Sequence, residues 1–471
     1  MNSELEKVVN EIVEQFKVEK EFLCKATQSF VDSMDTGLKH DKSSRDFMPM
    51  IPAYVTSIPN GKETGLFLAA DLGGTNFRVC SIKLNGDHTF AMEQSKAEIP
   101  RDLMKNSTAD ELFSYLAKKV KAFLCEYHSD VEDEEKLKLG FTFSFPVNQT
   151  AINRGTLMRW TKGFDLPDCV DKDVVELLQS NLDKLETNVH VAALANDTVG
   201  TLLARAYANN PEETKSNTVI GCIFGTGTNG AYFESLENIP KLDLSTVPKD
   251  AAGMVINTEW GSFDNLLQVL PTSVYDEILD SETSNKGFHL FEKRISGMFL
   301  GELLRVILID LFERGLIFQD LYKSRGGSLP HRLSEPWQLS SEVLSYLQID
   351  DSTDLKMSGL IMENVLRLPT NSEERLVIQK ITQAVASRAA HLSAIPLAAI
   401  VQRVAPTYKD DENDFEVGCD GSVVEFYPGF QANIKEALQL IDPLKGSKKK
   451  IHLRIAKDGS GVGAALCAAT T

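Results

Sequence analysis

The sequence has little positive charge for its size, and this scarcity limits the partners that the protein can have. Among its 471 residues, 49 Lys and Arg stand against 67 Asp and Glu, which gives a formal net charge of −18. Such a balance disfavours nucleic acid and anionic membranes as main partners. An anionic substrate must therefore be met by local donors and a metal ion, because no basic field surrounds the protein.

Cysteine and long apolar runs are also scarce. The seven cysteines are scattered, odd in number and form no Cys-x-x-Cys pair, which is typical of reduced thiols in a cytoplasmic protein. Residues 1–20 carry apolar side chains at helical spacing and predict an amphipathic helix, not a signal peptide. The most apolar late stretch, 392–401, is too short to span a bilayer and contains Pro396. We therefore expect a soluble, cytoplasmic protein without a membrane partner.

One motif is present twice, once in each half of the chain. A strand-like run at 66–70 leads into Asp71-Leu-Gly-Gly-Thr-Asn76, and another at 218–224 leads into Gly225-Thr-Gly-Thr-Asn229. Glycine lets backbone N–H groups approach an anion closely, and threonine adds a hydroxyl donor. Tight hairpin turns would explain either motif alone, whereas the recurrence favours two phosphate-binding turns. Neither carries the Gly-Lys-Ser/Thr ending of a Walker loop.

Strand-like and helix-like segments alternate along the chain, which predicts an α/β architecture. Strands are expected at 137–145 and 189–195. The polar loop 209–217 divides the chain into halves, 1–210 and 211–471. Helices are expected in both halves, at 109–127, 171–184, 198–208, 264–280, 288–314, 340–350, 356–366 and 373–403.

The candidate catalytic residue is Asp197, which follows an apolar strand at the point where a helix begins. Asp and Asn are preferred helix N-caps, so capping alone would also explain Asn196 and Asp197. The strand is apolar up to Asn196, however, so the carboxylate is expected at the sheet edge, where open α/β folds bind ligands. Phosphoryl transfer to an alcohol needs a carboxylate that accepts the hydroxyl proton.

Eight segments make the chain resemble the hexokinase family nearly end to end. They are Leu-Ala-Ala-Asp-Leu-Gly-Gly-Thr-Asn-Phe-Arg (68–78), Leu-Gly-Phe-Thr-Phe-Ser-Phe-Pro (139–146), Arg-Trp-Thr-Lys-Gly-Phe (159–164), Asn-Asp-Thr-Val-Gly-Thr (196–201), Ile-Phe-Gly-Thr-Gly-Thr-Asn (223–229), Asn-Thr-Glu-Trp-Gly-Ser-Phe (257–263), Phe-Glu-Lys-Arg-Ile-Ser-Gly-Met (291–298) and Gly-Cys-Asp-Gly-Ser-Val (418–423). The segments 86–88 and 455–466 look most like the fungal glucokinase branch of that family.

The resemblance implies an actin-like, sugar-kinase (ribonuclease H-like) fold, in which a duplicated α/β unit forms two lobes around a central cleft. Residues 1–210 would form a small-lobe half with the first hairpin and the catalytic Asp. Residues 211–471 would form a large-lobe half with the second hairpin and the adenosine site. The N-terminal helices are expected to pack on the large lobe, and the final helix is expected to return to the small lobe.

The resemblance also implies a function and its residues. The function is ATP-dependent phosphorylation of D-glucose at its 6-hydroxyl, the first step of glycolysis, with Mg²⁺ bound mainly through ATP and no separate protein metal site. Asp197 would be the base, and Lys162 and Arg78 would neutralise developing charge. The implied ATP-binding residues are Asp71, Leu72, Gly73, Gly74, Thr75, Asn76, Gly225, Thr226, Gly227, Thr228, Gly418, Cys419, Asp420, Gly421 and Ser422.

All but one of the implied glucose-binding residues have polar side chains, which suit a ring of hydroxyls. Hydrogen bonds to charged groups contribute ~1.5–3 kcal/mol each, so a few carboxylates provide both affinity and discrimination. The set is Ser144, Phe145, Thr161, Lys162, Asn196, Asp197, Asn229, Glu259 and Glu292.

Several alternatives stay open at this stage. Arg78 could be a strand residue in a surface salt bridge, Glu292 an ordinary helical residue, and 418–423 a simple hairpin turn. Gly459-x-Gly-x-Gly463 superficially matches a dinucleotide fingerprint, but the eight residues that follow leave no room for a βαβ unit. A broader hexokinase that also uses fructose and mannose, or a non-catalytic sugar sensor, would share the family pattern. Retention of Asp197 and of the turn residues favours activity, and no oligomeric state is predicted.

Overall fold

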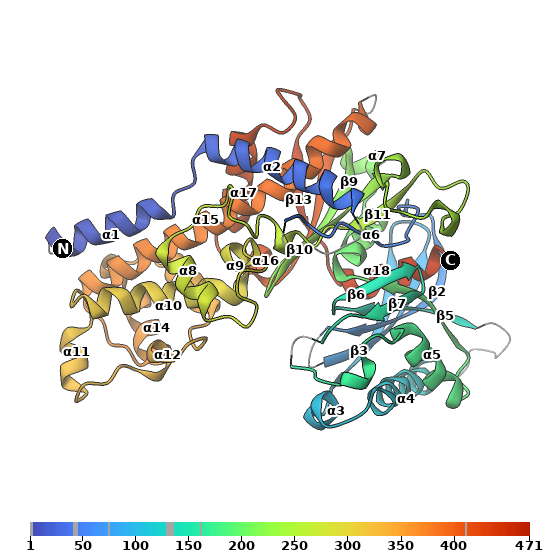
Figure 1. Ribbon diagram of the computed structural model, residues 1–471, viewed down its shortest axis with the longest axis horizontal. Coiled ribbons are helices and arrows are strands. Elements are labelled where there is room, and N and C mark those ends of the chain that lie inside the picture. Colours follow the sequence, from blue (N-terminus) through green and yellow to red (C-terminus); the bar gives the residue numbers. More distant parts are fainter. Residues whose placement is uncertain (1–2, 41–45, 74–75, 129–135, 161–162, 410–411) are drawn as a thin grey trace.

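Two lobes, each built around one mixed sheet, make up the protein (Figure 1). The computed structural model describes residues 3–40, 46–73, 76–128, 136–160, 163–409 and 412–471. The strands are β1 (Ile51–Pro52), β2 (Thr64–Leu72), β3 (Asn76–Asn85), β4 (Phe90–Glu98), β5 (Leu137–Phe143), β6 (Val147–Ala151), β7 (Arg154–Leu157), β8 (Val189–Ala195), β9 (Ser216–Phe224), β10 (Thr228–Ser235), β11 (Gly253–Asn257), β12 (Asp414–Asp420) and β13 (Ile451–Ile455).

The two sheets repeat one strand arrangement. The smaller sheet has the order β4-β3-β2-β5-β8, and the larger has the order β1-β11-β10-β9-β12-β13. In each, three consecutive strands pair antiparallel, and two later strands then add in parallel beside the first of the three. The short strand β1 joins the outer edge of the larger sheet. The predicted duplicated α/β fold is therefore confirmed.

Helices connect the parallel strands, because parallel neighbours need a long crossover connection. Those of the first half are α1 (Ser3–Gln15), α2 (Lys20–Lys39), α3 (Arg101–Lys105), α4 (Ala109–Tyr127), α5 (Val174–Lys184) and α6 (Asp197–Ala208), and the short α7 (Pro211–Thr214) lies in the loop between the halves. Those of the second half are α8 (Val274–Ser281), α9 (Glu292–Ile295), α10 (Gly297–Glu313), α11 (Gln319–Ser324), α12 (His331–Ser334), α13 (Ser341–Gln348), α14 (Lys356–Leu366), α15 (Ser372–Val404), α16 (Ser422–Phe426), α17 (Phe430–Ile441) and α18 (Gly459–Ala469).

Two of the expected helices differ from the structure for local reasons. The segment expected as helix 264–280 becomes helical only at α8, because Asp264 accepts the backbone N–H groups of 268–270 at 2.7–2.8 Å and holds a turn there. The expected helix 288–314 is divided into α9 and α10 at Ser296, whose backbone is extended. The first N–H groups of α10 donate to the turn at 225–226 instead of continuing α9.

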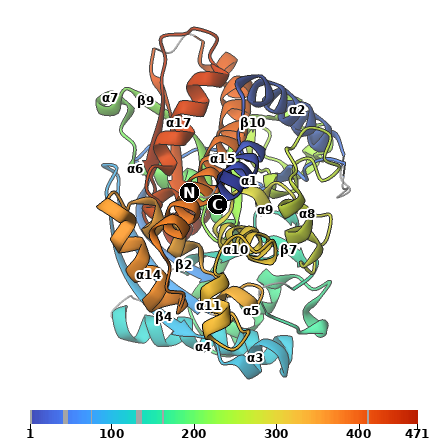
Figure 2. The same ribbon diagram turned by 90° about the vertical axis from the view of Figure 1, so that its left-hand side faces the viewer.

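The longest helix, α15, forms the centre of the larger lobe (Figure 2). Among the described residues, the segment 372–408 is the one helix long and apolar enough to cross a membrane, and 83% of its most apolar window is buried inside the protein. Pro396 lies within this helix and does not end it. The N-terminal helix α1 packs against α15 with its buried stripe of Leu5, Val9 and Ile12.

The last helix of each repeat packs against the sheet of the other repeat. Helix α6 follows β8 of the smaller sheet but packs on β9, β10 and β12, whereas α18 follows β13 of the larger sheet and packs on β2, β5 and β8. The two helices also cross each other in close contact. Glycines allow this approach: a Cβ on Gly463 would overlap the backbone of Gly200, and one on Gly200 would lie 2.8 Å from the Gly459 carbonyl oxygen.

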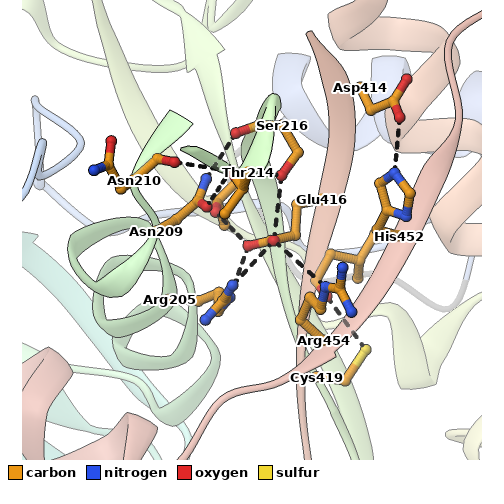
Figure 3. Close-up of polar contacts among 12 residues, drawn as sticks. Arg205, Asn209, Asn210, Thr214, Ser216, Asp414, Glu416, Cys419, His452 and Arg454 are labelled. Carbon is orange, nitrogen blue, oxygen red and sulfur yellow. Dashed lines mark hydrogen bonds and ion pairs between the residues drawn. The ribbon is translucent and has the colours of Figure 1, made fainter. Parts of the chain in front are cut away.

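A buried ion pair fixes α6 to the larger sheet (Figure 3). Arg205 of α6 donates to both carboxylate oxygens of Glu416 on β12, at 2.7 and 3.0 Å. Thr218 of β9 donates to the same carboxylate at 2.9 Å, and only 1% of the Glu416 side chain is exposed. The carboxylate therefore joins α6, β9 and β12, the three elements whose ends enter the site described below.

The helix crossing can be tested with Gly463→Ala. The added methyl group has to displace backbone, so we expect a loss of about 1–3 kcal/mol in the free energy of unfolding, measured by urea titration. Gly359→Ala is the matched control, because a Cβ there meets only the flexible end of Arg375. That helical change is expected to be neutral or stabilising. Equal effects of the two variants would contradict a tight crossing.

The buried ion pair predicts a non-additive double mutant. Arg205→Met leaves the Glu416 carboxylate buried without its guanidinium, which is expected to cost about 3–5 kcal/mol of unfolding free energy. Arg205→Met combined with Glu416→Met removes both charges and is expected to cost less than the single change. A double mutant less stable than Arg205→Met would contradict this assignment.

Candidate active site

The carboxyl ends of the parallel strands in the smaller sheet bring three chain segments together. Asp71 of β2 pairs with Thr142 of β5, and Thr142 pairs with Ala195 of β8. Gly73, Ser144 and Asn196 follow the ends of these strands, so they leave the sheet at one edge. The Ser144 N–H donates to the Leu72 carbonyl at 3.2 Å and ties two of the segments to each other.

Asn196 and Asp197 divide the roles of cap and first helical residue. Asn196 is the N-cap of α6, and its side-chain oxygen accepts the Thr198 N–H at 2.9 Å. Asp197 is the first residue of the helix and is half-buried, with Oδ1 2.9 Å from the same N–H. Because Asn196 already supplies the capping oxygen, capping alone does not explain a carboxylate at 197.

The first hairpin carries a charged pair at its tip. Asp71 lies one residue before the end of the paired part of β2, opposite Arg78 of β3, and their side chains approach to 3.3 Å. Arg78 also donates to Asp458 at 3.2 Å and to Ser460 at 2.6 Å, both from the segment that begins α18. Leu72 is buried in the core, so only its backbone faces the turn. Gly74 and Thr75 lie outside the described residues, and Asn76 begins β3.

The second hairpin is fixed to the start of α10. Gly225 N–H donates to the Gly227 carbonyl at 2.9 Å within the turn. The Gly297 N–H donates to the Gly225 carbonyl at 2.8 Å, and the Met298 N–H donates to the Thr226 carbonyl at 3.1 Å. Gly297 and Met298 belong to a recognised family segment but were not assigned a role from sequence. Their contribution depends on backbone contacts that residue type does not reveal.

A polar network lies directly behind this hairpin. Asn229 and Asn257 donate to the same oxygen of Glu259 at 3.1 and 2.8 Å, and Asn229 also donates to the Asn257 side chain at 2.8 Å. Glu292, at the start of α9, accepts the Thr228 N–H at 3.0 Å. Asn229, Glu259 and Glu292 are thus brought together from three distant segments. Asn257 was missed, although it lies on the strand end two residues before Glu259.

His289 is a further residue that sequence reasoning missed. Its Nδ1 lies 3.6 Å from Glu292 Oε1, an ion-pair distance rather than a hydrogen bond. The interaction with Glu292 raises the pKa of His289, burial of the ring opposes the rise, and the Glu259 charge reinforces it. A protonated imidazole would therefore stand beside two carboxylates that face the same region.

The aromatic side chains of the segment after β5 pack against one another and do not face a ligand site. Phe145 is buried between Trp160 and Phe164, with ring centroids 4.9 and 5.2 Å away. Its ring therefore supports the loop that precedes β6, and only its backbone is available to a ligand. Thr161 and Lys162 lie outside the described residues.

The segment 418–422 is a strand-to-helix turn, not the hairpin turn considered from sequence. Gly418, Cys419 and Asp420 end β12, and Gly421 has a φ of 110° before α16 begins at Ser422. The Cys419 side chain is buried against Cys222, and a Cβ on Gly418 would lie 2.8 Å from the Arg205 side chain. Gly418 and Cys419 are therefore buried within the lobe, because both faces of β12 are covered, and Asp420, Gly421 and Ser422 remain at the sheet edge.

A cavity of about 320 Å³ joins the two sheet edges. It is lined by Arg78 from the first hairpin, by Asp420 and Glu425 around the end of β12, and by Ile455, Ala456, Lys457, Asp458 and Ser460 on the way to α18. Within the parts of the chain that the structure describes, no group of three or more His, Cys, Asp or Glu side chains forms a metal site. The arrangement suits a phosphorylated ligand between the lobes, with polar groups for a hydroxylated partner behind the second hairpin.

Comparison with known proteins agrees with this geometry. Two consecutive family models, each described as hexokinase, match residues 8–207 and 219–470. Glucokinase-1 of Saccharomyces cerevisiae is 50% identical and the alignment covers 98% of this chain and 96% of that protein. Hexokinase-1 of the same yeast is 39% identical, with coverage of 99% and 92%. A solved hexokinase from Schistosoma mansoni in complex with glucose is 34% identical, with complete coverage of both chains and a TM-score of 0.85.

The chain therefore belongs to the hexokinase family and is an enzyme of the hexose kinase class, whose phosphoryl donor is ATP. The expected family and the similarity to fungal glucokinases are confirmed.

The pKa of His289 predicts how pH affects the pair that it forms with Glu292. A raised pKa means that the folded state holds the proton more tightly, so the stabilisation is complete below the ordinary value of about 6.5 and is lost as pH rises through the folded value. The melting temperature of the protein minus that of His289→Gln should therefore be largest near pH 6 and shrink toward pH 9. A difference that does not vary with pH would contradict a charged pair.

Proposed function

We propose that this protein transfers the γ-phosphoryl group of ATP to the 6-hydroxyl of D-glucose and releases glucose 6-phosphate and ADP. The observation that carries the proposal is the common edge of the smaller sheet, where Asp197, Ser144 and the first hairpin leave neighbouring strands. The similarity to proteins named glucokinase supports glucose over other hexoses.

In this proposal Asp197 accepts the proton of the sugar 6-hydroxyl. The oxygen then bonds to the γ-phosphorus while the bond from that phosphorus to the β-phosphate oxygen breaks, in an in-line displacement. Asn229, Glu259 and Glu292 bind other hydroxyls of the ring. The bond from Asn229 to Glu259 and the bond from the Thr228 N–H to Glu292 keep these side chains oriented before the sugar arrives.

The donor substrate is proposed to be ATP with its magnesium ion. The turns at 73–76 and 225–228 would hold the phosphates, and Asp420 to Ser422 would lie beside the adenosine. The chemistry of the cavity fits a metal-bound nucleotide, because Asp420, Glu425 and Asp458 outnumber the cations Arg78 and Lys457. When bound, magnesium would neutralise phosphate charge in this acidic surrounding.

Turnover of a sugar panel by two variants tests the proposal. Asp197→Asn keeps the shape of the side chain but removes its basicity, so kcat should fall by about 10²–10⁴ while the KM for glucose changes little. Asp183→Asn, an exposed change on α5 in the same lobe, is the matched control and should leave turnover unchanged. Rates are measured with glucose, mannose and fructose at saturating MgATP.

Each result has a defined meaning. Equal kcat/KM for glucose and fructose would replace the glucokinase assignment with that of a broad hexokinase. Undiminished turnover in Asp197→Asn would overturn the assignment of Asp197 as the base. Absence of turnover with every sugar would favour a non-catalytic sugar-binding protein.

A further inference from the structure

A four-residue polar cluster ties the first hairpin to the start of α18. Asp71 and Arg78 come from the hairpin, and Asp458 and Ser460 come from the segment that crosses from β13 to α18. Ser460 Oγ lies 2.9 Å from Asp71 Oδ2 and 2.6 Å from Arg78 Nη2. These contacts join residues 389 and 382 positions apart in sequence.

The direction of these hydrogen bonds follows from the chemistry of the side chains. A guanidinium can only donate, so the Ser460 oxygen must accept from Arg78. An ionised carboxylate can only accept, so the single hydroxyl proton of Ser460 goes to Asp71. Both bonds are charge-assisted, and about four-fifths of the Asp71 and Arg78 side chains is buried. The cluster therefore holds Asp71 Oδ2 in one place.

The other oxygen of Asp71 points in a different direction. Oδ1 lies near the Cβ position of Gly73, at 3.5 Å, a position that is also 3.9 Å from Ser144 Oγ. In the part of the chain that the structure describes, Oδ1 accepts no hydrogen bond, whereas Oδ2 accepts two. One oxygen is thus fixed by Ser460 and Arg78, and the second faces the phosphate-binding turn.

We infer that Ser460 is a positioning residue for the phosphoryl donor, which rests on the function proposed above. By holding Oδ2, Ser460 orients the Asp71 carboxylate so that Oδ1 faces the magnesium ion that arrives with ATP. A partner that orients a metal-facing carboxylate commonly changes metal affinity by 10–100-fold when removed. The Gly-x-Gly-x-Gly run around Ser460 therefore serves a nucleotide, but through a side chain and not through a dinucleotide fingerprint.

A purely structural role of α18 needs to be distinguished from this positioning role. Thr142 of β5 donates to the backbone carbonyl of Ser460 at 3.0 Å and is fully buried. Its backbone neighbours that of Asp71 in the sheet, but its hydroxyl donates to the Ser460 carbonyl and not to the Asp71 carboxylate. Thr142→Val is therefore a matched control, because it weakens the attachment of α18 and leaves the hydroxyl of Ser460 intact.

The experiment measures binding of β,γ-imido-ATP by calorimetry at graded Mg²⁺ and in EDTA, alongside turnover. In Ser460→Ala we expect the Mg²⁺ concentration for half-maximal binding to rise about tenfold, while affinity in EDTA stays within twofold. Ser460→Thr, which keeps the hydroxyl, and Thr142→Val should both keep the wild-type Mg²⁺ requirement. In an Asp71→Asn background, Ser460→Ala should have no further effect.

The outcomes separate this inference from the proposed function. An unchanged Mg²⁺ requirement in Ser460→Ala, with sugar turnover intact in the unmodified protein, would overturn the role of Ser460 alone. A rise of equal size in Thr142→Val would overturn it in favour of helix placement. An unmodified protein that binds no Mg²⁺-nucleotide would overturn both. If Ser460→Ala does not fold, Ser460→Cys replaces it, because a thiol is a similarly small but weak donor.

Discussion

The crossing of α6 and α18 is the constraint on which the rest of the structure depends. Each helix closes one repeat and packs on the sheet of the other, and Gly200 and Gly463 allow their backbones to touch. The first residue of α6 is Asp197, and the second of α18 is Ser460. The spacing of these helices therefore sets how the proposed base and the first phosphate hairpin stand relative to each other. A bulkier crossing would separate two groups that have to act on the same phosphoryl transfer.

Electrostatics in the site follow from the same architecture. The chain is strongly acidic, and the cavity between the lobes contains three carboxylates against two cations. Arg78, a candidate to neutralise phosphate charge, is already engaged by Asp71 and Asp458. Backbone N–H groups of the glycine turns carry no such counter-charge. In the proposed function, these carboxylates would favour a triphosphate that arrives with a divalent ion.

The parts of the site with local signals could be predicted from sequence. The strand-to-helix junction at Asp197 was visible because an apolar strand stops at Asn196, and both hairpins were visible because turn residues follow buried runs. Ser460 could not be found in this way, since its partners Asp71 and Arg78 lie far along the chain. Asn257 and His289 have nearby partners, Glu259 and Glu292, but no turn or strand-end signal of their own marked them. Gly418 and Cys419 were predicted to bind ATP together with Asp420 because the three residues belong to one contiguous motif. The buried part of β12 ends at Cys419, so the motif is divided between the lobe interior and the sheet edge.

The two hairpins of the duplicated unit differ in side-chain chemistry at two equivalent positions. Counted back from Asn76 and Asn229, the position of Asp71 in the first motif is held by Phe224 in the second. Counted forward, the position of Arg78 is held by Ala231, and both Phe224 and Ala231 are buried. The second hairpin therefore has no charged pair at these positions, and its polar contacts come from Asn229, Asn257 and Glu259 instead. The first hairpin carries an Asp71–Arg78 pair at these positions, whereas the polar groups beside the second hairpin are two amides and the Glu259 carboxylate. In the proposed reaction both turns would hold phosphates, and these two positions make the first turn the one with a charged pair.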